Sequence, residues 1–565
     1  MKPIREIILS IISATRCMAL WIVVVLLIPN VVLDCTESAS SIWKIANIAF
    51  PAGIYLLILT ASKYTGRTGI LLIPIMVLCA FQIVLLYLYG ESIIAVDMYL
   101  NVVTTNMSEA TELLGNLAPA IILVIVLYLP AIAWSIYALI RKLKMPHGAR
   151  KEFAIWGTSL ALFGSGMGAV GIYTGAKGDF RHDIFPINVI ANLCEAVRRT
   201  QHIADYPYTS TQFSYEARSL RNPDEREIYV YVIGETSRAQ NWELSGYHRP
   251  TNPRLSQEKN LVFFDRALSE SNTTHKSVPM LMSYVYAETF SAIDSIKSIM
   301  SAMKEAGFYT RFLSNQAPNR SYTEYFGNEA DDTRYTETGT HPHPYDDTLT
   351  AMVHQAISDT IHRKQFIVLH TYGSHFRYHD RYPEQFSYFK PDNPQEASPS
   401  ARQDLMNSYD NSIRFTDHVL ASIIGELKVA GCRSALLFSS DHGEDIYDDA
   451  RKRFLHASPT PTYHQLHVAM LAWLSDEFCE SHPEMIQNLR DNSHRRVSPQ
   501  KSMFNTAIDL CGVETPYADR SKSLASAAYT SAPPVYLTDL NKSVPLKESG
   551  IKSADCIILA SLFGL

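Results

Sequence analysis

Five long apolar stretches dominate the first third of the chain. They occupy residues 7–32, 42–61, 70–88, 118–140 and 153–174. Each approaches the ~20 residues that a helix needs to cross the hydrocarbon core of a bilayer. The pattern therefore predicts an α-helical membrane domain of five transmembrane helices over residues 1–175.

The charges between these stretches alternate. Lys2 and Arg5 precede the first stretch, Lys63 and Arg67 follow the second, and five basic residues lie between the fourth and the fifth, whereas residues 91–116 are acidic and contain no Lys or Arg. Because basic loops stay on the cytoplasmic side, the N-terminus is predicted inside and everything after the fifth helix outside. Length and charge asymmetry together disfavour the alternative, five buried helices of a soluble protein.

The acidic segment contains a spaced set of polar residues. Asn101, Thr105 and Glu109 recur every four residues, so a helix would place them on one face. An amide, a hydroxyl and a carboxylate in one stripe could bind an ammonium-bearing headgroup at the membrane surface. A solvated helical face would show the same spacing, and spacing alone favours it.

Residues 176–226 are predicted to bridge two domains. An apolar stripe runs along one helical side of 187–197. It fits either the bilayer interface or packing against the following domain. Residues 205–224 are predicted to be a mostly irregular linker.

The remaining residues, 227–565, have the composition of a soluble domain. Continuous apolar runs at 228–234, 366–372, 434–440 and 468–475 predict strands, and 293–306 and 403–427 predict helices. Apolar strands that alternate with helices indicate an α/β domain with a mainly parallel sheet covered on both faces.

Three of the predicted strands lead into groups that can bind a metal. Glu235 follows the first, His375 follows the second, and Asp441 and His442 follow the third within a DHGE sequence. Open parallel sheets place their sites at the carboxyl ends of the strands. Carboxylate and imidazole ligands suit Zn²⁺, so zinc is the predicted cofactor.

A nucleophile is predicted in SESNTTHKSVP, where Thr273 and Thr274 precede a probable helix. The N–H groups of a helix start favour a phosphate, and a threonine hydroxyl on zinc could attack phosphorus. The alternative is that these threonines only cap the helix, which this segment alone would favour. One of His456, His464 and His467 could protonate a leaving oxygen or hold a phosphoryl group.

The net charge and the spacing of the cysteines argue against a nucleic-acid-binding protein and against a cysteine zinc site. The net charge of the 565 residues is only -6, so nothing suggests a nucleic-acid partner. None of the 8 cysteines forms a CxxC pair, which argues against a cysteine zinc site.

These segments together resemble a known family. GETSRAQNWELSGYHRPTNP, TTHKSVP, GSH, SDHGE and a later LH occur in the order found in the membrane phosphoethanolamine transferases, which include the mobile colistin-resistance enzymes. The soluble domain of that family belongs to the alkaline phosphatase/sulfatase superfamily. The similarity spans almost the whole chain, although the disulfide pattern of its well-studied members is missing.

The resemblance implies a role for each matching residue. Glu235, Asp441 and His442 match zinc ligands, and Thr274 matches the nucleophile that also faces the zinc. His375 and His456 match histidines that contact the headgroup or a second zinc. Asn101, Thr105 and Glu109 match a headgroup-binding stripe, which reverses the preference for a solvated face. Arg320 stands near the place of a family lysine.

The implied function is transfer of phosphoethanolamine from phosphatidylethanolamine to lipid A or another envelope glycan through a covalent threonine intermediate. The implied protein is a monomer in the bacterial inner membrane with a periplasmic catalytic domain. Two alternatives remain: a glycerol-phosphate transferase of the lipoteichoic acid synthase type, and an inactive membrane sensor that keeps the fold. A formylglycine sulfatase would need a C/S-x-P-x-R motif, which is missing near Thr274.

Overall fold

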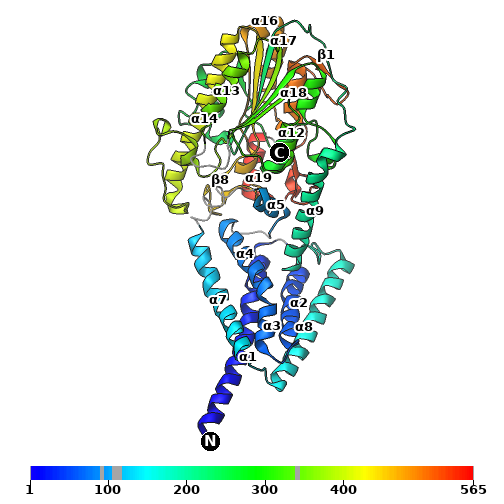
Figure 1. The fold of residues 1–565 in the computed structure, drawn as a ribbon, viewed down its shortest axis with the longest axis vertical. Coiled ribbons are helices and arrows are strands. Elements are labelled where there is room, and N and C mark those ends of the chain that lie inside the picture. The colour runs from blue at the N-terminus through cyan, green and yellow to red at the C-terminus, as the bar shows by residue number, and fades with distance from the viewer. Residues whose placement is uncertain (1, 38, 90–93, 105–116, 337–343, 564–565) are drawn as a thin grey trace. The chain divides into compact units, whose positions relative to one another are not determined.

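The computed structural model describes residues 2–37, 39–89, 94–104, 117–336 and 344–563. It divides into two compact units (Figure 1). The helical unit comprises Met1–Tyr99 and Leu113–Val197, and the sheet unit comprises Leu100–Glu112 and Arg198–Leu565. The division at Val197 lies between the predicted domain boundaries at residues 175 and 226.

The helices of the N-terminal part follow the predicted stretches. They are α1 (Lys2–Thr36), α2 (Ser41–Thr60), α3 (Thr65–Leu71), α4 (Ile73–Tyr89), α5 (Val96–Thr104), α7 (Ala118–Ile140) and α8 (His147–Thr174). Within the described residues, four helices are long and apolar enough to cross a membrane, and α3 with α4 makes a fifth if the bent pair is one span. The third predicted helix is therefore corrected to a broken one, bent by 44°. Pro74, which has no backbone N–H, lies just after the break.

Helices α2 and α8 pack closely because small residues line their contact. A Cβ atom on Gly53 would lie 2.4 Å from the backbone nitrogen of Ala161, and one on Gly164 would lie 2.5 Å from that of Phe50. Such small residues let membrane helices approach each other at backbone distance.

The bridging helix α9 (Ile187–Thr209) is longer than predicted. It includes the first residues of the stretch predicted to be irregular, because Tyr206 is buried and packs its ring against Tyr322 and Phe326. The predicted apolar stripe is exposed at Ile190, Leu193 and Val197.

A seven-stranded sheet forms the centre of the sheet unit, in the order β3-β10-β7-β2-β6-β4-β5. The strands are β2 (Glu227–Gly234), β3 (Leu261–Phe263), β4 (Tyr309–Ser314), β5 (Asp332–Tyr335), β6 (Lys364–His370), β7 (Arg433–Ser440) and β10 (Met470–Leu474). β7, β2, β6, β4 and β5 are parallel, whereas β10 pairs antiparallel with both β7 and β3. The mainly parallel sheet is therefore confirmed.

Alternate side chains of β2 enter two separate cores. Tyr229, Tyr231 and Ile233 belong to the core under α10 (Thr274–Leu281), α12 (Tyr322–Gly327) and α18 (Pro499–Leu510). Ile228, Val230 and Val232 belong to the core under α13 (Asp347–Ile357) and α14 (Arg402–Ala430). Figure 1 shows α13 and α14 on one side of the strands and α12 and α18 on the other.

The helix predicted over residues 293–306 is interrupted. A 3₁₀ segment covers Ala287–Ser295, and α11 (Ile299–Glu305) starts anew, capped by the side chain of Ser298. The other α-helices and β-strands of the described residues are α15 (Tyr463–Leu466), α16 (Asp476–Ser481), α17 (Pro483–Asn492), α19 (Ser553–Phe563), β1 (Arg218–Ser219), β8 (Asp445–Ile446), β9 (Phe454–Leu455), β11 (Val513–Glu514), β12 (Val535–Leu537) and β13 (Ser543–Pro545). All eight cysteines lie in the described part of the chain, and all are free.

Candidate active site

The parallel pairing of β2 and β7 brings two carboxylates together. Gly234 is in register with Ser440, so Glu235 and Asp441 leave the sheet side by side. The backbone N–H of Asp441 donates to the Gly234 carbonyl at 3.0 Å. A Cβ atom on Gly234 would lie 2.6 Å from the ring of Phe438, so a larger residue here would displace that ring.

Glu235, Asp441 and His442 form a buried cluster whose ligand atoms all lie within 4.8 Å of one another. His442 Nε2 lies 3.2 Å from Asp441 Oδ2 and 3.5 Å from Glu235 Oε1. The other ring nitrogen, Nδ1, lies 2.9 Å from the Gly443 carbonyl and donates to it, which leaves the Nε2 lone pair facing the carboxylates. Within the described residues, the buried Oδ2 atom of Asp441 accepts no hydrogen bond.

The electrostatics of this cluster favour a cation. Burial raises the pKa of Asp441. Burial alone would lower the pKa of His442, but the charges of Asp441 and Glu235 outweigh it and raise that pKa. The raised pKa of His442 indicates that the two buried carboxylates attract positive charge. A divalent metal would supply that charge. Two carboxylates, one imidazole and a hydroxyl fit a four-coordinate zinc site.

Thr274 supplies the hydroxyl. It is the first residue of α10, and its Oγ1 atom lies 3.1 Å from His442 Nε2 and 3.4 Å from each Glu235 carboxylate oxygen. Thr273 is the N-cap residue, but its side chain makes no capping hydrogen bond. Helix capping therefore does not explain the two threonines, and Thr274 is the one that faces the cluster.

Two histidines flank the cluster. The His456 ring lies 4.1 Å from the His442 ring, and the His375 ring lies 6.2 Å from that of His456. His456 Nδ1 is 3.0 Å from Glu444 Oε1. Burial lowers the pKa of His375 to about 4 and that of His456 to about 3, so both imidazoles are neutral at neutral pH.

The other two candidate histidines have structural contacts. His467 is held between the Tyr463 hydroxyl at 2.8 Å and the Asp265 carbonyl at 2.8 Å. His464 Nδ1 lies 3.3 Å from Gln240 Nε2. Of the three, His456 is thus the one that approaches the cluster.

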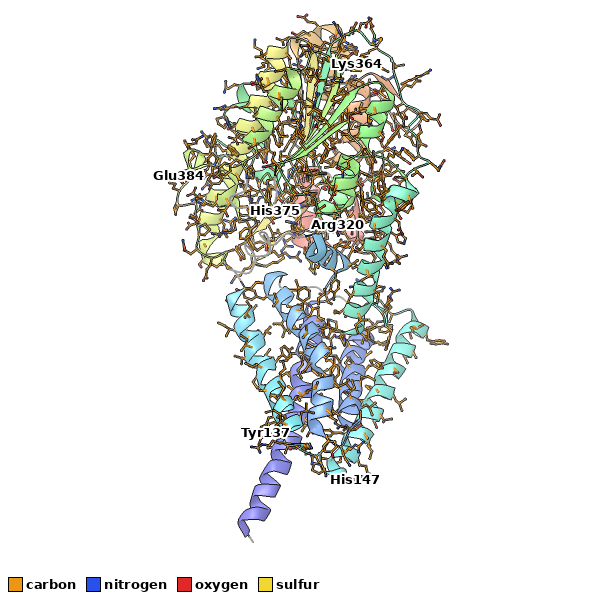
Figure 2. All side chains as sticks on the ribbon, in the orientation of Figure 1. Tyr137, His147, Arg320, Lys364, His375 and Glu384 are labelled. Carbon is orange, nitrogen blue, oxygen red and sulfur yellow. The ribbon has the colours of Figure 1, made fainter. Side chains whose placement is uncertain are left out.

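The structure describes the side chain of Arg320 but not those of the predicted headgroup stripe. Arg320, labelled in Figure 2, is exposed and follows β4. Its backbone N–H donates to the Glu324 carboxylate. Its guanidinium makes no hydrogen bond or ion pair with the described residues. Asn101 lies in α5, but its side chain, together with Thr105 and Glu109, lies outside the described residues.

Sequence reasoning missed two residues that touch the cluster. Gln316 Nε2 donates to Glu235 Oε2 at 3.2 Å and to the Thr371 carbonyl at 2.8 Å. Thr236 Oγ1 donates to Glu235 Oε1 at 2.6 Å. Recognition of β4 would have found Gln316, because it closely follows the end of that strand at Ser314.

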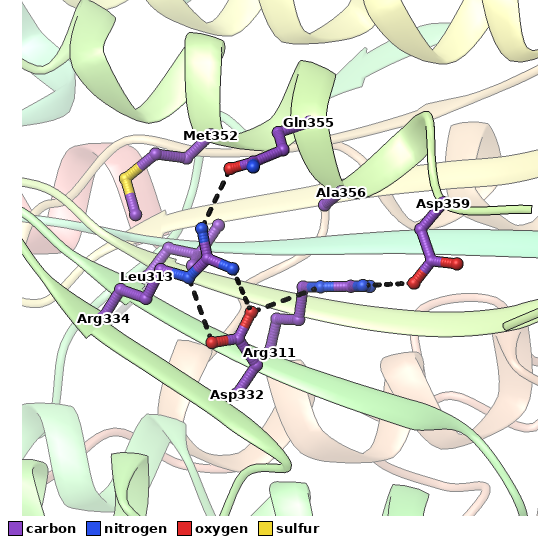
Figure 3. A pocket seen from close by; sticks show the side chains of 8 residues that line it. All are labelled: Arg311, Leu313, Asp332, Arg334, Met352, Gln355, Ala356 and Asp359. Atoms are coloured by element: carbon purple, nitrogen blue, oxygen red, sulfur yellow. Dashed lines mark hydrogen bonds and ion pairs between the residues drawn. The ribbon is translucent and has the colours of Figure 1, made fainter. Parts of the chain in front are cut away.

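A separate pocket lies along the sheet edge at β4 and β5 (Figure 3). Its charged groups already pair with one another: Arg311 lies 2.6 Å from Asp359, and Arg334 lies 2.9 Å from both Asp332 and Gln355. Unlike the cluster at Glu235, this pocket presents paired charges to a ligand.

Comparison with known proteins identifies the family of the sheet unit. The family model described as sulfatase matches residues 227–513, about half of the chain. The chain belongs to the sulfatase family. Its matched domain contains the three residues of the cluster, Glu235, Asp441 and His442, and Thr274, which faces them.

Curated relatives of this sulfatase-family chain carry transferase names. The chain is 27% identical over 334 residues to the Kdo(2)-lipid A phosphoethanolamine 7''-transferase of Escherichia coli K12, which covers 55% of this chain and 58% of the relative. It is 28% identical over 307 residues to phosphoethanolamine transferase EptA of the same organism, covering 53% and 55%. The chain thus matches little more than half the length of these relatives.

Solved structures extend the likeness of fold to the helical unit. The integral membrane protein lipooligosaccharide phosphoethanolamine transferase A (EptA) of Neisseria meningitidis matches with a TM-score of 0.70 at 19% identity, over 92% of this chain and 99% of that one. The C-terminal periplasmic domain of E. coli EptC in complex with Zn matches with a TM-score of 0.54 at 24% identity, over 60% and 97%. These likenesses confirm membrane helices joined to a sulfatase-like domain.

Proposed function

We propose that this chain is a zinc-dependent phosphoethanolamine transferase. It moves phosphoethanolamine from phosphatidylethanolamine to lipid A or another envelope glycan. The observation that carries the proposal is the placement of the Thr274 hydroxyl 3.1 Å from His442 Nε2 and beside Glu235, in a buried donor set suited to zinc. The names of the curated relatives support this reaction and this acceptor.

Each residue of the site has a part in two half-reactions. Glu235, Asp441 and His442 would hold zinc, which makes a bound hydroxyl more acidic and neutralises charge on phosphoryl oxygens. Thr274 Oγ1 then bonds to phosphorus while the bond from phosphorus to the diacylglycerol oxygen breaks. The proton lost by Thr274 balances the proton gained by diacylglycerol. In the second half-reaction an acceptor oxygen displaces Thr274, which predicts ping-pong kinetics.

The groups around the nucleophile suit this substrate. The first-turn N–H groups of α10 favour a phosphoryl anion. His375 and His456 are neutral, so their free ring nitrogens can accept hydrogen bonds from the ammonium headgroup or bind a second zinc. Asn101, Thr105 and Glu109 are the proposed headgroup stripe, and Arg320 the proposed counterpart of the family lysine.

The proposed location is the bacterial inner membrane. The basic residues in the first turns of α1 and in the segments after α2 and after α7 support a cytoplasmic N-terminus and a periplasmic sheet unit. Membrane lipids are then both the surroundings and the source of the donor.

Mass spectrometry of the full-length protein tests the proposal. Incubation with phosphatidylethanolamine should add one phosphoethanolamine group to Thr274, whereas phosphatidylglycerol should add nothing. Thr274→Ala should abolish the adduct and the transfer. The matched control is Thr273→Ala, because the neighbouring Thr273 hydroxyl contacts Ser271 and not the cluster. Labelling from phosphatidylglycerol, or full transfer by Thr274→Ala, would exclude the proposed reaction.

A further inference from the structure

Thr236 lies between the two carboxylates of the cluster and contacts both. Its hydroxyl donates to Glu235 Oε1 at 2.6 Å, and its backbone N–H donates to Asp441 Oδ1 at 3.1 Å. The residue is fully buried. It therefore links the end of β2 to the end of β7 through polar contacts to the ligands themselves.

The backbone of Thr236 is held in an unusual conformation. Its φ is +58°, a region that β-branched residues rarely adopt. Such a conformation persists only where the surroundings over-determine it, and it concentrates at functional sites. At Thr236 it is associated with an N–H that reaches one carboxylate and a hydroxyl that reaches the other.

Tyr409 of α14 holds the third polar group of Thr236. The Tyr409 hydroxyl donates to the Thr236 carbonyl at 2.7 Å and accepts from the Arg238 N–H at 2.9 Å. Tyr409 is also fully buried. Every polar group of Thr236 thus has a fixed partner, and two of the three partners are metal-binding carboxylates.

We propose that Thr236 is a positioning residue that sets the orientation of Glu235 and Asp441 toward the metal, and that Tyr409 holds Thr236 in place. Asp441 Oδ1 accepts from the Thr236 N–H and, at 2.7 Å, from the His442 N–H, which leaves Oδ2, without a hydrogen-bond partner among the described residues, as the oxygen for the metal. The contact at Glu235 Oε1 occupies one lone pair of that oxygen and leaves another for the metal.

The threonine side chain suits this role better than a serine in one respect. Its β-branch restricts rotation about χ1, so the hydroxyl stays directed at Glu235. Thr236→Ser keeps the donor and should retain most of the zinc affinity. Thr236→Val keeps the shape and removes the donor, so it isolates the hydrogen bond to Glu235.

The test measures zinc affinity of the full-length protein by competition with a chelator, without lipid. Loss of an outer-shell partner typically weakens metal binding by about 10- to 100-fold, and we expect Thr236→Val to fall in this range. Thr236→Ser should stay within a few-fold of the natural protein. The melting temperature of each metal-free variant, measured in parallel, separates loss of zinc binding from loss of folding.

The matched control is Thr416→Val in α14. Thr416 is also a buried threonine, and its hydroxyl donates to the Ser412 carbonyl at 3.1 Å rather than to a ligand. It should leave zinc affinity unchanged. If Thr236→Val fails to fold, Tyr409→Phe removes the support of Thr236 from a distance and should also weaken zinc binding.

Two results would overturn the inference: unchanged zinc affinity in the folded Thr236→Val or Tyr409→Phe protein, or equal weakening by Thr416→Val. The inference rests on the metal site that the proposed function uses, but not on the group transferred. Because the assay contains no lipid, a failure of phosphoethanolamine transfer would leave its outcome intact.

Discussion

The two ends of β2 each have a buried glutamate, and the two differ in their partners. Glu227 begins the strand, lies 3.1 Å from Arg221 and 3.2 Å from Arg433, and has Lys364 at 3.8 Å. Glu235 follows the strand, and its one ion-pair partner among the described residues is His442. Figure 2 shows Lys364 and His375 toward opposite ends of the sheet.

The comparison separates a structural carboxylate from one suited to a cation. Burial of a charge is unfavourable unless the charge is paired. Three basic side chains meet that requirement at Glu227. At the other end, Glu235 and Asp441 share one imidazole, which leaves negative charge for a metal to balance.

The largest expected effect comes from Glu235→Gln. Loss of a direct ligand should weaken zinc binding by more than the roughly 100-fold upper range for outer-shell changes, and transfer should be lost with it. The metal-free protein should be at least as stable as the natural one, because carboxylate repulsion is reduced. Chelator competition and urea unfolding measure the two effects. Zinc affinity close to that of the natural protein would remove Glu235 from the site.

Glu227→Gln should have the opposite outcome. It leaves Arg221, Lys364 and Arg433 near a neutral side chain, and breaking a buried ion pair is typically destabilising by ~3–5 kcal/mol. Urea unfolding of the metal-free protein measures this change in the free energy of unfolding. Zinc affinity should not change, because Glu227 lies at the opposite end of β2. A stable variant with weakened zinc binding would contradict the assignment of the two ends.

The melting temperature with and without zinc should also distinguish Glu227 from Glu235. A metal that binds only the folded state stabilises it by about 2.7 kcal/mol when its free concentration is 100 times Kd. Zinc should therefore raise the melting temperature of the natural protein and, by a similar increment, that of Glu227→Gln. It should not raise that of Glu235→Gln. Equal zinc-dependent shifts in all three proteins would place the bound zinc elsewhere.

The sequence was sufficient to predict the two strand ends that lead into the clustered carboxylates. Glu235 and Asp441 each follow a continuous apolar run, and parallel strands that lie next to each other bring such residues to one edge. The order of the sheet, with β2 beside both β6 and β7, could not be predicted, because pairing depends on contacts between distant segments.

Other features have no local signal. The polar residues Thr310 and Arg311 interrupt β4, so that strand was not predicted, and Gln316 was missed with it. The antiparallel direction of β10 was not predicted either, since an apolar run has no direction of its own. The positive φ of Thr236 depends on Tyr409 and Asp441, which are about 170 and 200 residues away.

The smallest expected effect concerns β6, which also differs between its ends. It begins with the charged Lys364 and ends with His370, where burial lowers the pKa to about 4. The unfolded histidine has a pKa near 6.5, so between these values the unfolded state binds more protons. The free energy of unfolding should therefore fall as pH decreases from about 6.5 to about 4, by at most ~1.4 kcal/mol per pH unit for this residue.

Substitution of His370 isolates its share of this pH dependence. His370→Gln removes the titrating group, so the decline in the free energy of unfolding on acidification should become shallower. The matched control is His494→Gln, because the His494 side chain is 79% exposed rather than buried. Urea unfolding of the metal-free proteins at pH 7, 6 and 5 supplies the slopes. A slope unchanged by His370→Gln would mean that His370 is not kept neutral by burial, and the carboxyl end of β6 would then hold a charge that the fold leaves unpaired.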